Sequence, residues 1–589
     1  RRPLARRALA LAPDDEGEVR NLIKLLGRLG DRAGAVQAYE DFARRLRVDF
    51  EVEPAPETLA TIEAIRTRQV AAVPSPLPLP APVVAASGSP SPVRSGRRRG
   101  VLSGMIVLLA LGAFALLGVV ARGSGVTERP AQPTAIAVLP FANMSPDGAD
   151  EYFSDGMTEE IMTALSRVEG LRVAARTSAF AFKGKRESVR EIGRQLGVGT
   201  VLEGSVRRAG DSLRVTAQLI DADDGYRLWA GTYDRNRSDV FAVQEEIAQA
   251  IVAALRVSLS GELGAMVVPP TADLAAYDFY LEGRHALNRR SGASLLEAAD
   301  YFAQAIARDA RFAQAFAGLA AAYVLLPGYN VTGSSEAWPK SRAAAERALA
   351  LDSTLAEAHT TLAYGRFMFD SDWRGAEQGF RRAIALDPGY PTAHHWYGDF
   401  LGGRGDLEGY LQEVRLAHAL DPLSRQIGTE VGRALWALRR DDEAVTHLQL
   451  LLRADPMFAE AHVTLGRVYL QQGRLADAIG AFQKGVELRD RDALDLAELA
   501  NAYALAGKRS EARRLLMELE ARSRREYVQP TAFAIVHMGL GEDERAFDWL
   551  DRAAAEHDGW LAESIFYPTF NPLRSHPRYP LLLQSLGLR

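Results

Sequence analysis

The sequence predicts a multidomain protein with an α-helical N-terminal remnant, a single transmembrane helix, a small α+β domain and a C-terminal all-α solenoid. Three observations lead to this fold class. The segment 101–121 carries no charged side chain. Residues 134–262 mix short apolar runs of strand length with amphipathic helical segments. In the C-terminal half an aspartate recurs every 34 or 35 residues, which indicates a helical repeat.

At 589 residues the chain exceeds what one hydrophobic core supports, so several domains are expected. There is no cysteine, which excludes disulfides, thiolate zinc sites and cysteine nucleophiles. A net charge of −5 favours no particular partner. We divide the chain into a helical module (1–72), a Pro-rich basic linker (73–100), a transmembrane helix (101–121), an α+β domain (134–262) and a repeat array with a C-terminal cap (272–589).

The apolar segment Val101–Ala121 is predicted to cross a membrane. As a helix it would span roughly 31 Å, close to the hydrocarbon thickness of a bilayer. Arginines crowd its N-terminal side, so the positive-inside rule leaves the first hundred residues in the cytoplasm and the later domains in the periplasm. These membrane-flanking residues are Arg94, Arg97, Arg98 and Arg99. We therefore expect a single-pass protein of the bacterial inner (cytoplasmic) membrane; the alternative is a buried core helix.

Helical periodicity in the first 72 residues predicts helices over about 19–29, 32–48 and 57–69. The run LLGRLGDRAGAVQAYEDFARRLRVDFEVEPAPETLATIEAIR resembles the bacterial transcriptional activation domain of SARP-type regulators. The residues that carry the resemblance are Gly30-Asp31, Ala35, Tyr39, Leu46 and Glu53-Pro54. The alternative is a helical-hairpin packing module with no regulatory role.

In the SARP-type family an upstream winged helix-turn-helix domain contacts DNA, and nothing in this sequence matches it. The resemblance therefore implies DNA as a partner only through a missing upstream domain. The chain opens on Arg1 rather than Met, and we expect the start of a larger protein to precede it. After this module, closely spaced prolines make residues 73–99 a semi-rigid spacer that cannot build a core.

Residues 134–262 alternate predicted strands and helices. A short apolar run at 136–140 indicates a buried strand, and a helix is expected over about 157–168. Strands over 201–208 and 213–220 flank the turn Ala209-Gly210-Asp211, which predicts a hairpin. In the second of these strands apolar and polar residues alternate, as in an antiparallel strand with one buried face. A third strand at 226–233 and a helix from Asp239 complete the domain.

Several phrases of this domain look very much like the TolB-type amino-terminal domain, which occurs in CadC-like membrane regulators and beside class III adenylate cyclases. They include IAVLPFANMS, DEYFSDGMTEEIMTALSRV and LGVGTVLEGSVRRAGDSLRVTAQLIDADDGYRLWAGTYDR. The family brings no catalytic role that these residues could take over.

The repeat in residues 272–589 has a period of 34–35 residues. Its markers are Asp352, Asp387, Asp421, Asp455 and Asp490, with small residues in step at Ala363, Gly398, Gly432, Gly466 and Ala500. Small residues at the crossings let paired helices approach closely, and this period is the signature of tetratricopeptide repeats. Six to eight units fit.

Tetratricopeptide arrays present a concave groove lined by their first helices. The family's register implies that the groove is lined by Tyr364, His395, Asp399, Arg433, Arg467 and Asn501. With Arg433 and Arg467 on neighbouring repeats, we hypothesise that this ladder binds an acidic or extended peptide segment of a partner protein. The alternative is a solvated groove wall. His394 and His395 are no metal pair, because adjacent residues on a helix point apart.

No nucleophile elbow, zinc-protease motif or phosphate-binding loop is present, so we assign no catalytic residue, no cofactor and no metal site. We expect a non-enzymatic, membrane-spanning transcriptional regulator of the SARP/CadC-like type that binds a protein or peptide through its repeats, with homodimerisation as an option. Two alternatives stay open. One is a membrane-anchored tetratricopeptide scaffold for envelope protein assembly, and the other is an accessory part of a nucleotide cyclase.

Overall fold

The computed structural model describes residues 39, 42, 43, 58, 62, 134–146, 150–168, 170–255, 269–329 and 331–588. The chain divides into two compact units, 1–125 and 126–589. In the first unit the described residues are all helical, and Phe42 and Ile62 are buried. The helices predicted over 19–29, 32–48 and 57–69 otherwise lie outside the described residues, as do the linker and Arg94, Arg97, Arg98 and Arg99.

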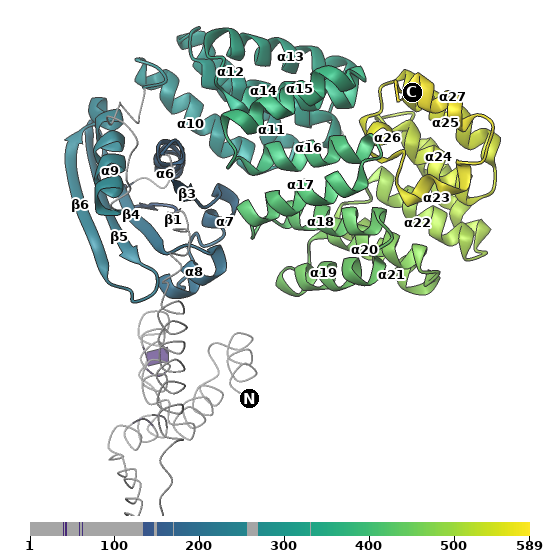
Figure 1. Cartoon of the computed structure of the whole chain (residues 1–589), viewed down its shortest axis with the longest axis horizontal. Helices are drawn as coiled ribbons and strands as arrows, with labels where there is room; N and C mark the ends of the chain where they lie inside the picture. The colour runs from purple at the N-terminus through teal and green to yellow at the C-terminus, as the bar shows by residue number, and fades with distance from the viewer. Residues whose placement is uncertain are drawn as a thin grey trace, which may run out of the picture. The chain divides into compact units, whose positions relative to one another are not determined.

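The second unit begins with a sheet of strand order β3-β1-β4-β5-β6, in which the short strand β2 also pairs with β4 (Figure 1). β1 lies parallel to β3 and β4, whereas β4, β5 and β6 are antiparallel to one another. The strands are β1 (Thr134–Val138), β2 (Ala142–Asn143), β3 (Leu171–Val173), β4 (Thr200–Ala209), β5 (Ser212–Asp221) and β6 (Arg227–Asn236).

Helices cover both faces of the sheet near β1 because that strand is apolar on both sides. Ile136 and Val138 pack in one core with α6 and α9, and Ala135 and Ala137 pack in another with α8. Parallel strands are ordinarily buried in this way on both faces. The helices of this part are α6 (Glu151–Ser166), α7 (Arg176–Phe180), α8 (Val189–Leu196), η2 (Arg237–Asp239) and α9 (Val240–Leu255).

The predicted hairpin is confirmed. β4 and β5 pair along their whole length across a turn at Gly210, whose φ of +59° suits a residue without a side chain. Leu213, Val215 and Leu219 are buried on one face of β5, so the alternation in the sequence identified the covered face correctly. The predicted helix at 157–168 is also present, but it begins six residues earlier, at Glu151.

The rest of the unit is an array of helix pairs, as the 34-residue period predicts (Figure 1). Asp352, Asp387, Asp421 and Asp455 each follow the last residue of a second helix. The pairs are α10 (Leu274–Asn288) with α11 (Gly292–Arg308), α12 (Ala313–Leu325) with α13 (Ser334–Leu351), α14 (Ala356–Asp370) with α15 (Trp373–Leu386), α16 (Pro391–Gly403) with α17 (Leu407–Leu420), α18 (Arg425–Ala437) with α19 (Asp441–Ala454), α20 (Ala459–Gln471) with α21 (Leu475–Leu488), α22 (Ala493–Leu505) with α23 (Arg509–Arg522), and α24 (Pro530–Gly539) with α25 (Asp543–Ala555).

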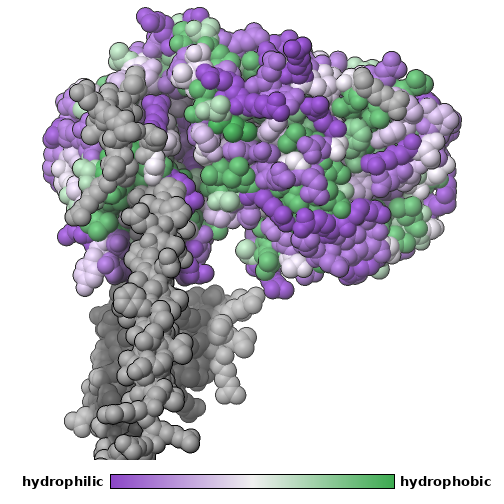
Figure 2. All heavy atoms as spheres, in the orientation of Figure 1, coloured by the Kyte–Doolittle hydropathy of each residue, from purple (hydrophilic) through white to green (hydrophobic). Residues whose placement is uncertain are grey.

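Three short elements end the chain, namely α26 (Gly559–Ser564), η4 (Pro568–Leu573) and α27 (Tyr579–Ser585). Their apolar side chains Ile565, Phe570 and Leu582 are buried with Phe547 and Leu550 of α25. The ending therefore covers the hydrophobic face of the last helix pair, which would otherwise meet water. Hydrophobic side chains lie in small groups among hydrophilic ones on the face drawn in Figure 2.

The sheet and the helix array share one hydrophobic core. Tyr277 and Leu281 of α10 are buried in the same cluster as α6 and α9. The side chain of Gln244 in α9 donates a hydrogen bond of 3.0 Å to the Tyr277 hydroxyl. Farther along, the Ser178 hydroxyl donates to a carboxylate oxygen of Asp421 at 2.5 Å. These buried contacts join the two parts firmly, since separating them would expose apolar side chains and leave polar groups unpaired.

The fold class and the inner-membrane localisation predicted from the sequence need correction. Among the described residues, no helix is both long and apolar enough to cross a membrane. The longest described helix, α13, has 18 residues and carries charged side chains at Glu336, Lys340 and Arg342, among others. The predicted spanning segment 101–121 itself lies outside the described residues.

Small residues at the crossings fix how closely the helices of a pair approach. A Cβ atom added to Gly365 would lie 2.0 Å from the ring of Trp338, which comes from the preceding pair. A Cβ atom added to Gly432 would likewise clash with Leu448, and one added to Gly466 would clash with Phe482. By contrast, nothing lies within 4 Å of a Cβ atom added to Gly480, on the exposed side of α21.

Two glycine-to-alanine substitutions should therefore change stability in opposite directions. Gly365→Ala should destabilise the protein by about 1–3 kcal/mol, because the Trp338 ring has to move. Gly480→Ala should stabilise it by about 0.5–1 kcal/mol through helix propensity alone. Urea denaturation followed by circular dichroism measures both. A Gly365→Ala protein as stable as wild type would show that the pairs do not pack this closely.

Candidate functional site

The six residues predicted to line the groove lie on five consecutive first helices. We call the surface that these helices share the inner surface. Five of the six side chains are buried, and the sixth, Tyr364, is half-buried. They are Tyr364 in α14, His395 and Asp399 in α16, Arg433 in α18, Arg467 in α20 and Asn501 in α22. The burial means that other parts of this chain already contact most of the predicted groove.

Arg433 is the centre of a buried ionic cluster. One of its Nη atoms lies 2.9 Å from Glu563 and 3.2 Å from Glu430, and the other lies 2.6 Å from Glu460. The three carboxylates come from α18, α20 and α26, so one guanidinium connects three helices. Its planar array of donors suits this arrangement, which a lysine could not reproduce.

Residues 559–573, which we call the closing segment, cover the inner surface. Ala562 is buried among aromatic side chains of α14 and α16. The Tyr567 ring stacks on Tyr410 at 6.1 Å and meets Trp436 edge-on at 5.8 Å. A partner that is to touch Arg433 or the aromatic side chains of α14 and α16 would therefore first have to displace this segment.

Arg467, the second arginine of the predicted ladder, is paired in the same manner. Its Nε lies 2.7 Å from Glu498 in α22, and both side chains are buried. Trp560 of the closing segment lies over its guanidinium, with 5.6 Å to the ring centroid. Both arginines thus lie on the inner surface as predicted. Each guanidinium is already paired with carboxylate groups of this chain.

A second cluster lies one turn away, where His395, Asp399 and Glu430 approach each other. His395 Nε2 is 3.5 Å from an Asp399 oxygen, and the Tyr410 hydroxyl donates to Glu430 at 2.7 Å. Burial raises the pKa of Asp399 well above its usual range and that of Glu430 to about 7. Burial lowers the pKa of His395 to about 3, so its imidazole is neutral.

Adjacent His394 points elsewhere, as helix geometry requires. Its Nδ1 is 2.7 Å from Glu413 and its Nε2 is 3.1 Å from the Pro388 carbonyl oxygen. Sequence reasoning had found Arg433 and His395, but it missed their partners Glu430, Glu460 and Glu563. Glu430 stands one turn before Arg433 on the same helix, which is a usable signal. Nothing local to Glu563 indicates a contact 130 residues away.

A third group of charges joins the sheet to the array. Arg284 of α10 lies 2.9 Å from Glu357 of α14 and 3.4 Å from Glu159 of α6, which also pairs with Arg176. The side chain of Asn288 donates to Glu159 at 3.2 Å. These are structural contacts between rigid elements, and they leave no acid or base facing an open cavity.

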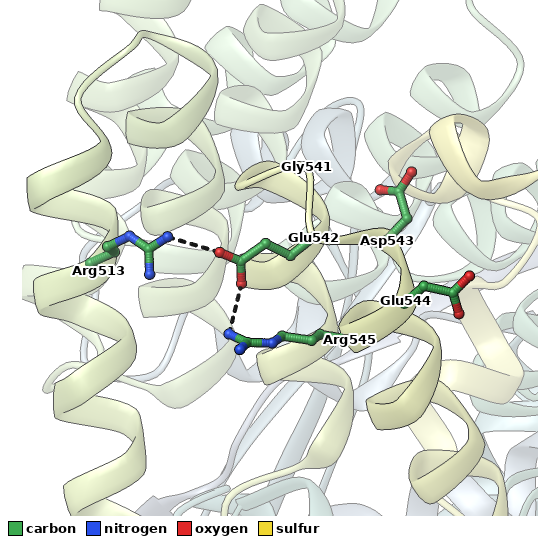
Figure 3. A pocket seen from close by; sticks show the side chains of 6 residues that line it. All are labelled: Arg513, Gly541, Glu542, Asp543, Glu544 and Arg545. Atoms are coloured by element: carbon green, nitrogen blue, oxygen red, sulfur yellow. Dashed lines mark hydrogen bonds and ion pairs between the residues drawn. The ribbon is translucent and has the colours of Figure 1, made fainter.

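An open depression near the C-terminus is lined by charged side chains, of which Glu542 pairs with two arginines (Figure 3). Glu542 accepts hydrogen bonds from Arg513 at 2.9 Å and from Arg545 at 3.3 Å. Asp543 and Glu544 belong to the first turn of α25, where acidic side chains favour the helix dipole. Glu542 also lies 2.8 Å from Nδ1 of the buried His537, and no serine, threonine or cysteine lines the depression.

Comparison with family models identifies three modules in the order predicted. Residues 3–66 match the bacterial transcriptional activator domain, and residues 430–493 match the tetratricopeptide repeat. Residues 132–250 match the second domain of HilA/YgeH-like transcriptional regulators. The last match covers the domain that we expected to be TolB-like, so the TolB-type assignment is not supported.

A curated relative is similar to part of the chain. It is the "Putative adenylate cyclase 3" of Rhizobium meliloti (strain 1021), which is 41% identical over 245 residues. The match covers 40% of this chain and spans 40% of the relative's length. Its cyclase activity therefore cannot be transferred to this chain from the match.

Solved structures with tetratricopeptide folds match shorter parts of the chain. PilW, described as a widely conserved type IV pilus biogenesis factor, is 22% identical with a TM-score of 0.31, over 36% of this chain and 94% of PilW. YrrB, described as a TPR protein with an unusual peptide-binding site, is 20% identical with a TM-score of 0.25, over 34% of this chain and 97% of YrrB. TM-scores this low support no argument about function.

The Arg433 cluster predicts a large difference between a buried and an exposed arginine. Arg433→Met should destabilise the protein by about 3–5 kcal/mol, because it leaves buried carboxylates without their cation. Arg440→Met removes a partly exposed pair with Glu443 and should cost about 1 kcal/mol or less. Chemical denaturation of both variants measures the difference. Equal losses would mean that the cluster is open to solvent.

Proposed function

We propose that this chain is the regulatory and partner-binding part of a transcriptional regulator and that it has no catalytic activity of its own. The observation that carries the proposal is the combination of modules in one chain. A transcriptional activator domain and a regulator domain precede a tetratricopeptide array. The first two modules support a role in transcription control, and the array would supply a surface for protein partners.

Two features of the structure support a non-catalytic role. The charged side chains of the inner surface pair with each other and are buried, so a substrate would not reach them. The depression around Glu542 holds ion pairs rather than an activated nucleophile. In this proposal DNA is contacted by a domain outside the present sequence, as the SARP-type resemblance implies.

The array and the HilA/YgeH-like domain would act as one body. Their shared core and the Arg284 contacts allow little independent motion. A partner bound to the array would therefore change the position or assembly of the whole unit rather than bend it internally. The inner-surface residues Tyr364, Asp399 and Arg433 would take part only where a partner displaces the closing segment.

A second candidate function is that of an accessory part of a nucleotide cyclase. The observation that favours it is the 41% identity to a relative described as an adenylate cyclase. The two functions differ in what changes when the protein is lost. A regulator alters transcript levels directly, whereas a cyclase component alters the concentration of a cyclic nucleotide first.

The test is deletion of the gene that encodes this chain, followed by RNA sequencing and cyclic AMP measurement in the same cultures. We expect a defined set of transcripts to change while cyclic AMP stays constant. Complementation with the wild-type gene should restore the set. Because Gly480→Ala alters neither a charge nor a buried contact, it should complement equally well and serves as the control.

Two results would contradict the proposal. A fall in cyclic AMP that precedes every transcript change would support the cyclase role. Unchanged transcripts, together with loss of specific protein complexes in affinity purification, would support a scaffold whose repeats hold other proteins together.

A further inference from the structure

In the cluster of His395, Asp399 and Glu430, the buried carboxyl group of Asp399 is paired with no arginine or lysine of the described residues. Asp399, Glu430, Glu460 and Glu563 are near each other, and Arg433 is the cation that pairs with three of them. Asp399 does not reach Arg433 through an ion pair. Its Oδ2 approaches His395, and its Oδ1 is buried without a hydrogen-bond partner. An unpaired carboxylate oxygen in this position is costly.

Three side chains of the cluster bring possible metal ligands close together. Their ligand atoms, one nitrogen and two carboxylate oxygens, all lie within 4.8 Å of one another. The His395 and Asp399 atoms are 3.5 Å apart. Two ligands bound tetrahedrally at about 2.1 Å from a metal are about 3.4 Å apart, so this edge of the site needs almost no adjustment.

The surroundings also suit a cation. The Tyr410 hydroxyl orients the Glu430 carboxylate, as outer groups do for metal-bound carboxylates. The Tyr567 hydroxyl, which meets α16 at Gly402, is buried and likewise lacks a partner. Asp399 Oδ1 and the Tyr567 hydroxyl are thus two buried oxygens without a hydrogen-bond partner. The closing segment covers the site, so its occupant must be small.

We propose that His395, Asp399 and Glu430 form a binding site for one divalent transition-metal ion, with Zn²⁺ as the best fit and Mn²⁺ as its competitor. An imidazole with two carboxylates favours these ions over Ca²⁺ and Mg²⁺, which take oxygen ligands. The ion would connect α16 to α18 directly beneath the closing segment. In this site Asp399 would be a metal ligand rather than a residue of the predicted peptide groove. The proposal also replaces our expectation that the chain holds no metal.

The test uses the full chain, stripped with EDTA and then dialysed against Zn²⁺. We expect about one Zn²⁺ per chain by mass spectrometry of the metal and a higher melting temperature than that of the stripped protein. In Asp399→Asn the asparagine has almost the same shape as aspartate and carries no charge, so the variant should fold. It should bind Zn²⁺ at least ~10-fold more weakly and lose the temperature shift. Asp543→Asn, an exposed carboxylate in α25, is the matched control and should bind normally.

Co²⁺ provides a second measurement that a purely structural effect of Asp399→Asn would not mimic. Bound to these ligands it should give visible d–d absorption that Zn²⁺ displaces and that Asp399→Asn abolishes. Mn²⁺ competition ranks the two ions. The proposal is overturned if the wild-type chain retains no stoichiometric metal. Protons, rather than a metal ion, would then neutralise the buried carboxyl groups of Asp399 and Glu430. It is equally overturned if Asp399→Asn binds Zn²⁺ as tightly as wild type.

Discussion

The pairing of Arg433 with Glu430, Glu460 and Glu563 is the interaction on which the inner surface depends. Burying the guanidinium of Arg433 with the carboxylates of Glu430 and Glu563 is expensive, and only close, well-directed contacts compensate for it. The array supplies such contacts from α18 and α20, but it needs the third carboxylate from α26. The ionic cluster is therefore complete only when the closing segment, which contains Glu563, lies on the inner surface.

Apolar burial provides most of the stabilisation of the closing segment, and the ionic cluster determines where it lies. Ile565, Tyr567 and Phe570 are almost fully buried, and each such side chain contributes roughly 1.5–3 kcal/mol. Hydrophobic contacts are not directional, so they would permit several positions of the segment along the inner surface. The pairing of Glu563 with Arg433 favours the position in which no buried charge is left alone.

Much of the fold could be predicted because its signals are local or periodic. The aspartates that end the second helices identified the repeat, and Gly432 and Gly466 mark helix crossings because only small residues fit there. The turn at Gly210 located the hairpin. The candidate site was predicted only in part. Register placed Arg433 on the correct surface. It could not reveal that Glu563, 130 residues later in the chain, pairs with Arg433 there.

The predicted transmembrane helix was not supported. No described helix is long and apolar enough to cross a membrane, and segment 101–121 lies outside the described residues. The sequence also did not predict that the sheet and the array share a hydrophobic core. The residues of α10 that pack into this core follow an ordinary helical pattern in the sequence. Tyr277 and Leu281 look like repeat residues in the sequence, and in the structure they belong to the one core that the sheet and the array share.

Amide hydrogen exchange over residues 559–567 of the intact protein tests most directly whether the inner surface is closed by its own chain. If the closing segment lies on the inner surface as described, its amides should be protected to a degree similar to those of α16 and α18. Exchange as fast as that of the exposed turn at 523–526 would contradict the account and would leave the inner surface open to a partner.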